Sequence, residues 1–396
     1  MLYYLLKGLL RPALRVFYAH ATDAGPESLP EAGPLIVVAN HPNTLMAPLP
    51  VGMLWRRQLH FLTNSRFFTS VGGWVLRASG AIPLYRQEDH AAAPAGERPA
   101  GGLRNPQRAA NNDASFRASF ELLSAGGALL IFPEGSSVLT RRLRPVKSGA
   151  ARIALGAEAR HDWQLGVRIV PVGLNYAAAD RFRSRVYRRV GPPIRVADYR
   201  ARYEANPSAA IRALTADLRR ALDQQLHAPR TDADEALLRA LEALLPGLLS
   251  LLPLVPLVPL PPRTDRPAAR ASSSTAGPEF ALVGALLGTL HWLDGRDPAR
   301  GQALRQRLLD QQHARHRAGL APGAPLNLPP PHGGARARLV AVLGGPVWAW
   351  GVPHHAMAYR LPAYLAQRLT REAEFIASLT MVLGMLLLPL FYGAQT

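Results

Sequence analysis

The chain has 396 residues, enough to bury one large core or two smaller ones. It contains no cysteine, which excludes disulfide scaffolds, thiolate metal sites and cysteine nucleophiles. The net charge of +19 favours a polyanionic partner: nucleic acid, anionic lipid headgroups or a phosphorylated substrate. Lys7 and Lys147 are the only lysines, and so strong an arginine bias is explained equally well by a GC-rich genome. No basic block with interleaved aromatic residues is present, which argues against nucleic acid.

Residues 1–29 are predicted to hold an amphipathic helix. The segment Met1–Tyr18 is apolar but carries Lys7, Arg11 and Arg15 at helical spacing, and no cleavage site follows it, so it does not read as a cleavable signal peptide. Two interpretations stay open. The helix lies in the headgroup layer of a membrane, or it covers the core of a soluble domain.

Residues 30–228 alternate short apolar runs with helical stretches, which is typical of an α/β layer fold. The expected strands are Leu35–Ala39, Gly80–Tyr85, Ala128–Phe132 and Arg168–Leu174. The expected helices are Thr44–Arg56, Phe68–Ala78, Ser115–Ser124, Ser148–Glu158 and Ala209–His227. Residues 88–112 are rich in Pro, Gly and Ala without periodicity, which predicts a flexible loop.

Residues 229–337 begin with a proline-rich hydrophobic segment. Ala243–Pro262 has no charged residue and is long enough to span a bilayer, but prolines interrupt it, so a re-entrant or interfacial segment is expected. A linker over 263–278 follows, then an apolar helix at Phe280–Leu293 and a polar helical segment at 296–317.

Residues 338–396 are predicted to form a hydrophobic helical region. Leu339–Tyr359 and Phe375–Thr396 contain no Lys, Arg, Asp or Glu, and both are long enough to cross a membrane. Prolines and a His pair weaken the first as a span. The alternative is a pair of helices that pack on the α/β domain.

Five sequence blocks occur in a fixed order between positions 40 and 176. They are Asn40-His41-Pro42-Asn43, Ser79-Gly80-Ala81-Ile82-Pro83-Leu84-Tyr85-Arg86, Phe132-Pro133-Glu134-Gly135, Pro145-Val146-Lys147-Ser148-Gly149 and Ile169-Val170-Pro171-Val172-Gly173. Together they resemble the motifs of the glycerophospholipid acyltransferases, which include the lysophospholipid and glycerol-phosphate acyltransferases. The hydrophobic tail also looks like that of a bacterial branch of this family. The resemblance implies a central, mostly parallel sheet flanked by helices.

The resemblance implies acyl transfer with His41 as the general base. A base must remove the proton of the acceptor hydroxyl as its oxygen attacks the thioester, and the pKa of histidine suits that task. No covalent enzyme intermediate, metal or cofactor is implied, and the co-substrate is acyl-CoA or acyl carrier protein.

The acceptor's phosphate needs cationic donors, and an arginine provides a planar fork for it. Arg86, at the end of an expected strand, is the first candidate, with a surface arginine as the alternative. Lys147 is a second candidate, because it precedes an expected helix whose N-terminal amides could help hold an anion, although simple solvent exposure is equally compatible.

The resemblance places the turn formed by Phe132, Pro133, Glu134 and Gly135 beside the acceptor. Glu134 is expected to fix the turn or bind the glycerol, and to be paired with an arginine because a free carboxylate would repel phosphate. Gly135 would permit close approach of the backbone. Two further positions complete the predicted site: Pro171 and Val172 on the acyl-donor side, and Asn43, which orients the His turn or caps a helix.

The family's motif also has an Asp that orients the His, with four or five residues between them, and here that Asp is absent. The strict spacing points to Met46, whereas Pro48 in the position after the motif favours Ala47 as the vacant position. Three explanations stay open: natural decay to a lipid-binding protein, an Asp→Ala variant of an active enzyme, or replacement by a distant acid such as Asp89 or Asp113.

The expected function is transfer of a fatty acyl group to glycerol 3-phosphate, dihydroxyacetone phosphate or lysophosphatidic acid, impaired by loss of the Asp. A phospholipid membrane is the expected partner and the cytoplasmic face of a bacterial inner membrane the expected location. Two other classes compete with this prediction: a non-catalytic lipid- or acyl-binding membrane protein, and an integral membrane transporter.

Overall fold

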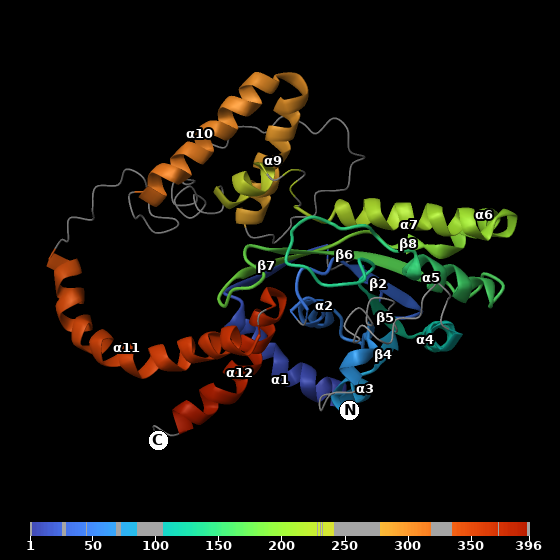
Figure 1. Cartoon of the computed structure of the whole chain (residues 1–396), viewed down its shortest axis with the longest axis horizontal. Coiled ribbons are helices and arrows are strands. Elements are labelled where there is room, and N and C mark those ends of the chain that lie inside the picture. Colours follow the sequence, from blue (N-terminus) through green and yellow to red (C-terminus); the bar gives the residue numbers. More distant parts are fainter. Residues whose placement is uncertain are drawn as a thin grey trace, which may run out of the picture. The chain divides into compact units, whose positions relative to one another are not determined.

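The computed structural model describes residues 2–25, 29–44, 46–68, 73–84, 106–227, 229, 231, 233–240, 278–317, 335–370 and 372–393 (Figure 1). The chain divides into two compact units, Met1–Leu226 and His227–Thr396, which are described separately.

The first unit is built on an eight-stranded sheet in the order β1-β7-β6-β2-β5-β3-β4, with β8 paired to β6. Five strand pairs are parallel, and only the β6–β7 and β6–β8 pairs among the described strands are antiparallel. The predicted α/β fold with a mostly parallel sheet is therefore confirmed. The strands are β1 (His20–Ala24), β2 (Leu35–Ala39), β3 (His60–Asn64), β4 (Ala81–Leu84), β5 (Ala128–Ile131), β6 (Arg168–Tyr176), β7 (Arg185–Val190) and β8 (Ile194–Arg195).

The four predicted strands correspond to β2, β4, β5 and β6, whereas β1, β3, β7 and β8 were not predicted. The predicted four contain short apolar runs. By contrast, β1 reads HATDA and β7 reads RVYRRV, and neither contains such a run. These two strands pair with each other in parallel. Main-chain pairing therefore forms strands that apolar periodicity does not reveal.

The core lies where helices pack on one face of the central strands (Figure 1). Residues of one parity on β2, Ile36 and Val38, join a buried cluster with Leu129 and Ile131 of β5 and with side chains of three helices. Successive residues of a strand point to opposite faces, so this parity selects the helix-covered side. The three helices are α4 (Pro106–Ser124), α5 (Gly149–Ala159) and α7 (Pro207–Asp223).

The helix boundaries correct several predictions. The helix expected over 44–56 is α2, which spans only Pro48–Leu54, because a turn occupies the residues before it. The helix expected over 68–78 is a short 3-10 turn η2 (Ser65–Phe68) followed by α3 (Gly73–Ala78). Residues 106–112 belong to α4 instead of a loop, while 88–105 lie outside the described residues. The remaining short elements are η4 (Val196–Tyr199) and α6 (Arg200–Ala205).

The predicted N-terminal helix is α1 (Leu2–Phe17). Its C-terminal end is anchored through the buried side chains of Leu14 and Phe17. Its N-terminal half leaves Leu5 70% and Leu9 57% exposed. The buried end fits the interpretation of a helix that covers the core, whereas a position in the headgroup layer of a membrane stays a prediction.

In the second unit, the described residues form a helical segment at 233–240 and the helices α9 (Pro278–Arg296), α10 (Pro298–Arg317), α11 (Ala335–Leu369) and α12 (Ala373–Gly393). The helices predicted at 280–293 and 296–317 are confirmed. The segment Ala243–Pro262 and nearly all of the predicted linker lie outside the described residues. Among the described helices, α12 alone is long and apolar enough to cross a membrane, judged by length and composition.

A buried carboxylate joins the segment 233–240 to α10. Asp234 accepts a hydrogen bond from Arg305 Nη1 at 2.6 Å and one from the main-chain amide of Thr231 at 3.0 Å. The other end of the Arg305 guanidinium binds Asp294 on α9. One arginine therefore connects three helical segments of the second unit.

Candidate active site

The candidate site begins where the central strand β2 ends. The side chain of Asn40, the next residue, donates from Nδ2 to the carbonyl of Leu174 at 3.0 Å and accepts from the amide of Leu174 at 2.7 Å. Ala39, the last residue of β2, is paired with Val172 of β6. The amide side chain of Asn40 thus continues the hydrogen bonding between β2 and β6 and sets the direction in which the chain leaves the sheet.

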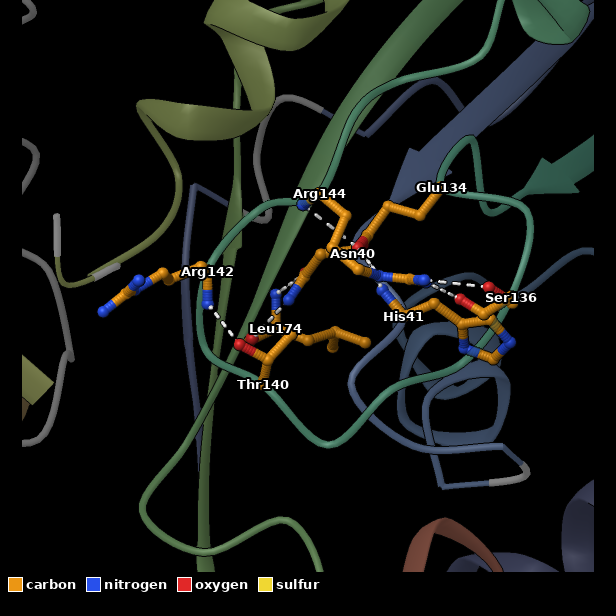
Figure 2. A network of polar contacts seen from close by, with 8 residues as sticks. All are labelled: Asn40, His41, Glu134, Ser136, Thr140, Arg142, Arg144 and Leu174. Atoms are coloured by element: carbon orange, nitrogen blue, oxygen red, sulfur yellow. Dashed lines mark hydrogen bonds and ion pairs between the residues drawn. The ribbon is translucent and has the colours of Figure 1, made fainter. Parts of the chain in front are cut away.

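His41 is held by the loop that follows β5. Its imidazole stacks on the ring of Phe132, with centroids 4.1 Å apart and planes inclined by 17°. Its main-chain amide donates to Glu134 Oε1 at 2.8 Å, and its carbonyl accepts from the amide of Val138 at 3.2 Å. Figure 2 shows the imidazole beside this network, with Glu134 and Arg144 behind it.

The arginine partner predicted for Glu134 is Arg144, whose Nε lies 3.0 Å from Glu134 Oε2. The Glu134 side chain is 3% exposed and that of Arg144 24%. The rest of the guanidinium binds Ser136, through Nη1 to Oγ at 2.8 Å and through Nη2 to the carbonyl (Figure 2). One oxygen of Glu134 therefore binds the His41 main chain and the other binds Arg144, so this carboxylate fixes the backbone of the His turn.

Gly135 and Lys147 lie against each other. Gly135 has a φ of +82°, and a Cβ added there would lie 2.7 Å from Lys147 Nζ. The main-chain amide of Lys147 donates to the carbonyl of Pro133 at 2.8 Å. A glycine is therefore favoured at 135 by its left-handed conformation, while a Cβ there would only displace the flexible end of the Lys147 side chain. Lys147 is exposed and directly precedes Ser148, the N-cap of α5, and its role as a phosphate ligand stays a prediction.

The same loop carries three arginines that the sequence analysis did not select: Arg141, Arg142 and Arg144. Arg141 donates to the carbonyl of Ala177, beyond the end of β6. The side chain of Arg142 points away from the Glu134 network in Figure 2, while its main-chain amide donates to Thr140 Oγ1 at 3.3 Å. The signal was visible as a cluster of cations after the Phe-Pro-Glu-Gly turn. Arg86, the predicted phosphate ligand, lies outside the described residues.

Both positions considered for the family's Asp are buried. Ala47 is fully buried and is the N-cap of α2, followed by Pro48. Met46 is also fully buried, and its carbonyl accepts a hydrogen bond from the hydroxyl of Tyr176 at 2.5 Å. The backbone of Ala47 is helical, with φ −89° and ψ −51°, and Pro50 at the third helical position has no amide hydrogen, so an Asp at 47 would not act as an ordinary N-cap.

Asn43 connects the His turn to the segment after β6. It is fully buried, and its Nδ2 donates to the carbonyl of Ala179 at 3.0 Å. The alternative that Asn43 caps the following helix is wrong, because the N-cap of α2 is Ala47. Its predicted role in orienting the turn stays a prediction that this contact supports.

One of the two alternative acids lies in the part of the chain that the structure describes. Asp113 is exposed on α4 and does not lie in a loop. Asp23 is bound by Arg188, with the Nε–Oδ1 distance at 2.6 Å. Asp89 lies outside the described residues. Pro171 and Val172 are buried on β6 and are paired with Val38 and Ala39, the last two residues of β2 before the His turn. In the part of the chain that the structure describes, no group of His, Asp or Glu could hold a metal ion.

Comparisons with known proteins agree with the sequence motifs. The Acyltransferase family model matches residues 20–175, which include every described residue of the predicted site. The chain is 38% identical over 102 residues to glycerol-3-phosphate O-acyltransferase 2 of Saccharomyces cerevisiae, and 40% identical over 81 residues to glycerol-3-phosphate O-acyltransferase 1 of the same yeast. These matches cover 26% and 20% of this chain, but only 14% and 10% of the two yeast proteins.

A solved structure, the 1-acyl-sn-glycerophosphate (LPA) acyltransferase PlsC from Thermotoga maritima, is 16% identical. The comparison covers 56% of this chain and 78% of that chain, with a TM-score of 0.38. A score this low supports no structural argument, so the fold assignment depends on the strand pairing described above.

Proposed function

We propose that this chain transfers a fatty acyl group from an acyl thioester to a hydroxyl of a glycerol-phosphate-type acceptor. The observation that carries the proposal is the anchored His41: a family-matched stretch holds its main chain through Glu134 and its imidazole against Phe132. Acceptors in this class include glycerol 3-phosphate, dihydroxyacetone phosphate and lysophosphatidic acid. The donor is acyl-CoA or acyl carrier protein.

In the proposed reaction the His41 imidazole takes the proton of the acceptor hydroxyl as its oxygen attacks the thioester carbonyl. The tetrahedral intermediate then collapses, the C–S bond breaks, and the imidazolium returns the proton to the leaving thiolate. No bond to the enzyme forms in this scheme. A fixed main chain at His41 keeps the imidazole within reach of the hydroxyl, and misplacement of a base by about 1 Å lowers rates by about a hundredfold.

The loop between positions 138 and 147 has a cationic side chain and leads into a helix N-terminus, which both favour binding of an anionic acceptor. Lys147 is exposed beside Gly135, and the N-terminus of α5 follows it, where main-chain amides favour a negative group. We assign Lys147 to the phosphate of the acceptor, together with Arg86. Lys147→Met should therefore raise KM for the phosphate-bearing acceptor, while KM for the acyl donor stays the same.

A second candidate is a lipid- or acyl-binding protein that has lost its catalytic power. Ala47 favours it, because no carboxylate is available at the buried N-cap position. Loss of the acid that orients a catalytic histidine costs about 10⁴ in turnover in serine proteases. In such a protein the fold and the acceptor site are retained, but acyl transfer is too slow to be its function.

Thiol release from acyl-CoA, measured with a panel of phosphate-bearing acceptors, tests the proposal. The proposed enzyme releases thiol only when an acceptor is present, and His41→Ala abolishes that release. A wild-type rate that is unchanged in His41→Ala would refute the mechanism. A chain that binds acceptor or acyl-CoA without turnover, even with Asp at position 47, would favour the binding protein.

We place the chain at a membrane, on the cytoplasmic face of a bacterial inner membrane as the resemblance suggests. Support comes from the apolar α12 and from the exposed Leu5 and Leu9 of α1, next to Lys7 and Arg11. Co-sedimentation of the full chain with anionic and neutral vesicles tests this location. Binding that neither vesicle type supports would contradict it.

A further inference from the structure

The α11–α12 hairpin has small residues inside and large apolar residues outside. The buried residues are Ala358, Pro362 and Ala366 on α11 and Ala377, Ser378, Thr380, Met381 and Gly384 on α12, and all but Pro362 and Met381 are small. Val382, Leu386 and Leu390 of α12 point outward and are 42%, 60% and 69% exposed. A helical hairpin in water buries its large side chains, whereas small residues at the seam are typical of helix pairs in lipid.

The two helices run antiparallel, side by side (Figure 1). Thr370 and Glu372 lie in the short turn between them, and His355 Nδ1 of α11 meets the hydroxyl of Tyr392 of α12 at 2.8 Å. The C-terminal part of α11, from His355 to Leu369, therefore packs along α12. Whatever surrounds α12 also surrounds this part of α11.

The outer faces of the two helices differ in chemistry. On α11 the exposed positions Met357, Arg360, Tyr364 and Arg368 repeat at helical spacing, about half a turn away from the buried seam. The guanidinium of Arg368 lies over the Tyr364 ring, 5.4 Å from its centroid. The exposed side chains of Val382, Leu386 and Leu390 on the outer face of α12 are all apolar. The hairpin thus has one apolar side and one arginine-bearing side.

An upright, membrane-spanning hairpin conflicts with the position of Arg360. The 21 residues of α12 would extend about 31 Å, close to the hydrocarbon thickness of a bilayer. Arg360 is ten residues from Thr370 in the turn, about 15 Å along the axis, and five residues from His355, about 8 Å. On both measures its charge would lie inside the hydrocarbon core, where arginine is costly.

We propose that the α11–α12 hairpin lies in one leaflet of a phospholipid bilayer without crossing it. The apolar side of α12 faces the acyl chains, and Arg360 and Arg368 on α11 face anionic headgroups and water. The spacing between packed helix axes, about 8–10 Å, matches the distance from the headgroup level to the upper acyl chains. This inference does not depend on acyl transfer, because its tests measure position and binding only.

The natural chain has no cysteine, so single cysteines can map the hairpin in the full-length protein. Leu369→Cys marks the turn end of α11, where Leu369 is 67% exposed, and Gly393→Cys marks the far end of α12, where an added Cβ meets no atom within 4 Å. A membrane-impermeant maleimide is applied to sealed, uniformly oriented vesicles from expressing cells. If both ends of the hairpin lie on the same side of the membrane, cysteines at 369 and 393 are labelled to the same extent, both before and after the vesicles are permeabilised. If one cysteine is labelled in sealed vesicles and the other becomes labelled only after permeabilisation, the hairpin crosses the membrane and the proposal is overturned.

Arg360→Leu gives a second test with opposite signs for the two arrangements. In the proposed arrangement the variant loses one headgroup contact and binds phosphatidylglycerol vesicles about fivefold more weakly. In a spanning hairpin the same variant removes a charge from hydrocarbon and inserts better. Arg307→Leu, at an exposed position of α10, makes the same charge change and should alter binding less. Stronger binding of Arg360→Leu, or equal losses in both variants, would refute the assigned orientation.

A second copy of the chain is the other occupant that could cover the apolar side of α12. A nitroxide attached to Leu386→Cys separates the two cases. Protection from a water-soluble nickel complex only when vesicles are added supports the bilayer. Protection in lipid-free solution, together with a dimeric mass, would overturn it.

Discussion

The pair formed by Glu134 and Arg144 allows a quantitative test of how the His turn is held. Arg144→Met removes the guanidinium and keeps much of the side-chain volume. Glu134, whose side chain is 3% exposed, is then left as a buried carboxylate, and Ser136 loses two hydrogen-bond donors. The double variant Glu134→Gln/Arg144→Met removes the charge as well and keeps an oxygen that can accept from His41 N.

The magnitude follows from the burial of each partner. Breaking a buried ion pair costs about 3–5 kcal/mol because the remaining charge has no compensation. Arg144 is 24% exposed, so water screens part of this loss, and about 3 kcal/mol is expected for Arg144→Met. Restoring neutrality should recover roughly half of it, since the loss of ordinary hydrogen bonds costs about 1–1.5 kcal/mol.

A reporter of the first unit alone makes the measurement unambiguous. With cysteine at Ala154, which is fully buried in α5, thiol labelling along a urea series gives the free energy of unfolding of this unit. Arg195→Met is the matched control, because Arg195 and Asp198 are 74% and 61% exposed and 3.6 Å apart; it should change stability by less than about 0.5 kcal/mol. If the double variant proves no more stable than Arg144→Met, the buried-charge argument fails. In the assay for acyl transfer, Arg144→Met should lower kcat with little change in KM for the acceptor.

Three further predictions concern other contacts. Asn40→Leu leaves the amide and carbonyl of Leu174 buried and unpaired, and should cost about 3 kcal/mol in the same labelling assay; a loss below about 1 kcal/mol would show that water replaces the bridge. Gly135→Ala imposes a left-handed alanine and displaces the end of the Lys147 side chain, so a loss of about 1–2 kcal/mol in the free energy of unfolding and a higher KM for the phosphate acceptor are expected. An unchanged KM would contradict the assignment of Lys147 to the phosphate. Burial would raise the pKa of Asp234, but hydrogen bonds, chiefly from Arg305, outweigh it and lower that pKa to about 2. Because this folded-state pKa is depressed, about 2 kcal/mol of stability is present above pH 4 and is lost between about pH 4 and 2. Acid unfolding, followed by the circular dichroism of the helices, should lose this pH-dependent loss of stability in Asp234→Asn. An acid transition that is the same in both proteins would refute the prediction.

The central strands could be predicted because each is marked by a short apolar run in its own sequence. The run Leu35–Ala39 is apolar at every position, as a strand buried on both faces must be, and β2 is fully buried. The turn glycine at 135 and the ion pair of Glu134 also followed from residue chemistry. The ion pair was expected because a free carboxylate would repel the acceptor's phosphate, and Arg144 forms it although this arginine was not identified.

The remaining features depend on contacts between distant segments. Nothing in the sequence near Asn40 indicates that its amide side chain replaces a strand pair with Leu174, which is 134 residues away. Arg144 was not predicted because the cluster of arginines after the Phe-Pro-Glu-Gly turn does not indicate which of them binds Glu134. The three arginines of β7 hid a strand whose pairing with β6 is set by the main chain.

The central claim is that His41 is the base of an acyl transfer and that Ala47 occupies the place of its orienting acid. Turnover of acyl-CoA with a phosphate-bearing acceptor, compared among wild type, Ala47→Asp and Ala47→Asp/His41→Ala, tests it most directly. The account predicts that Ala47→Asp raises kcat by several orders of magnitude, up to about 10⁴, and that His41→Ala removes the whole gain. A folded Ala47→Asp variant with no gain in turnover, or a gain that survives His41→Ala, would contradict it.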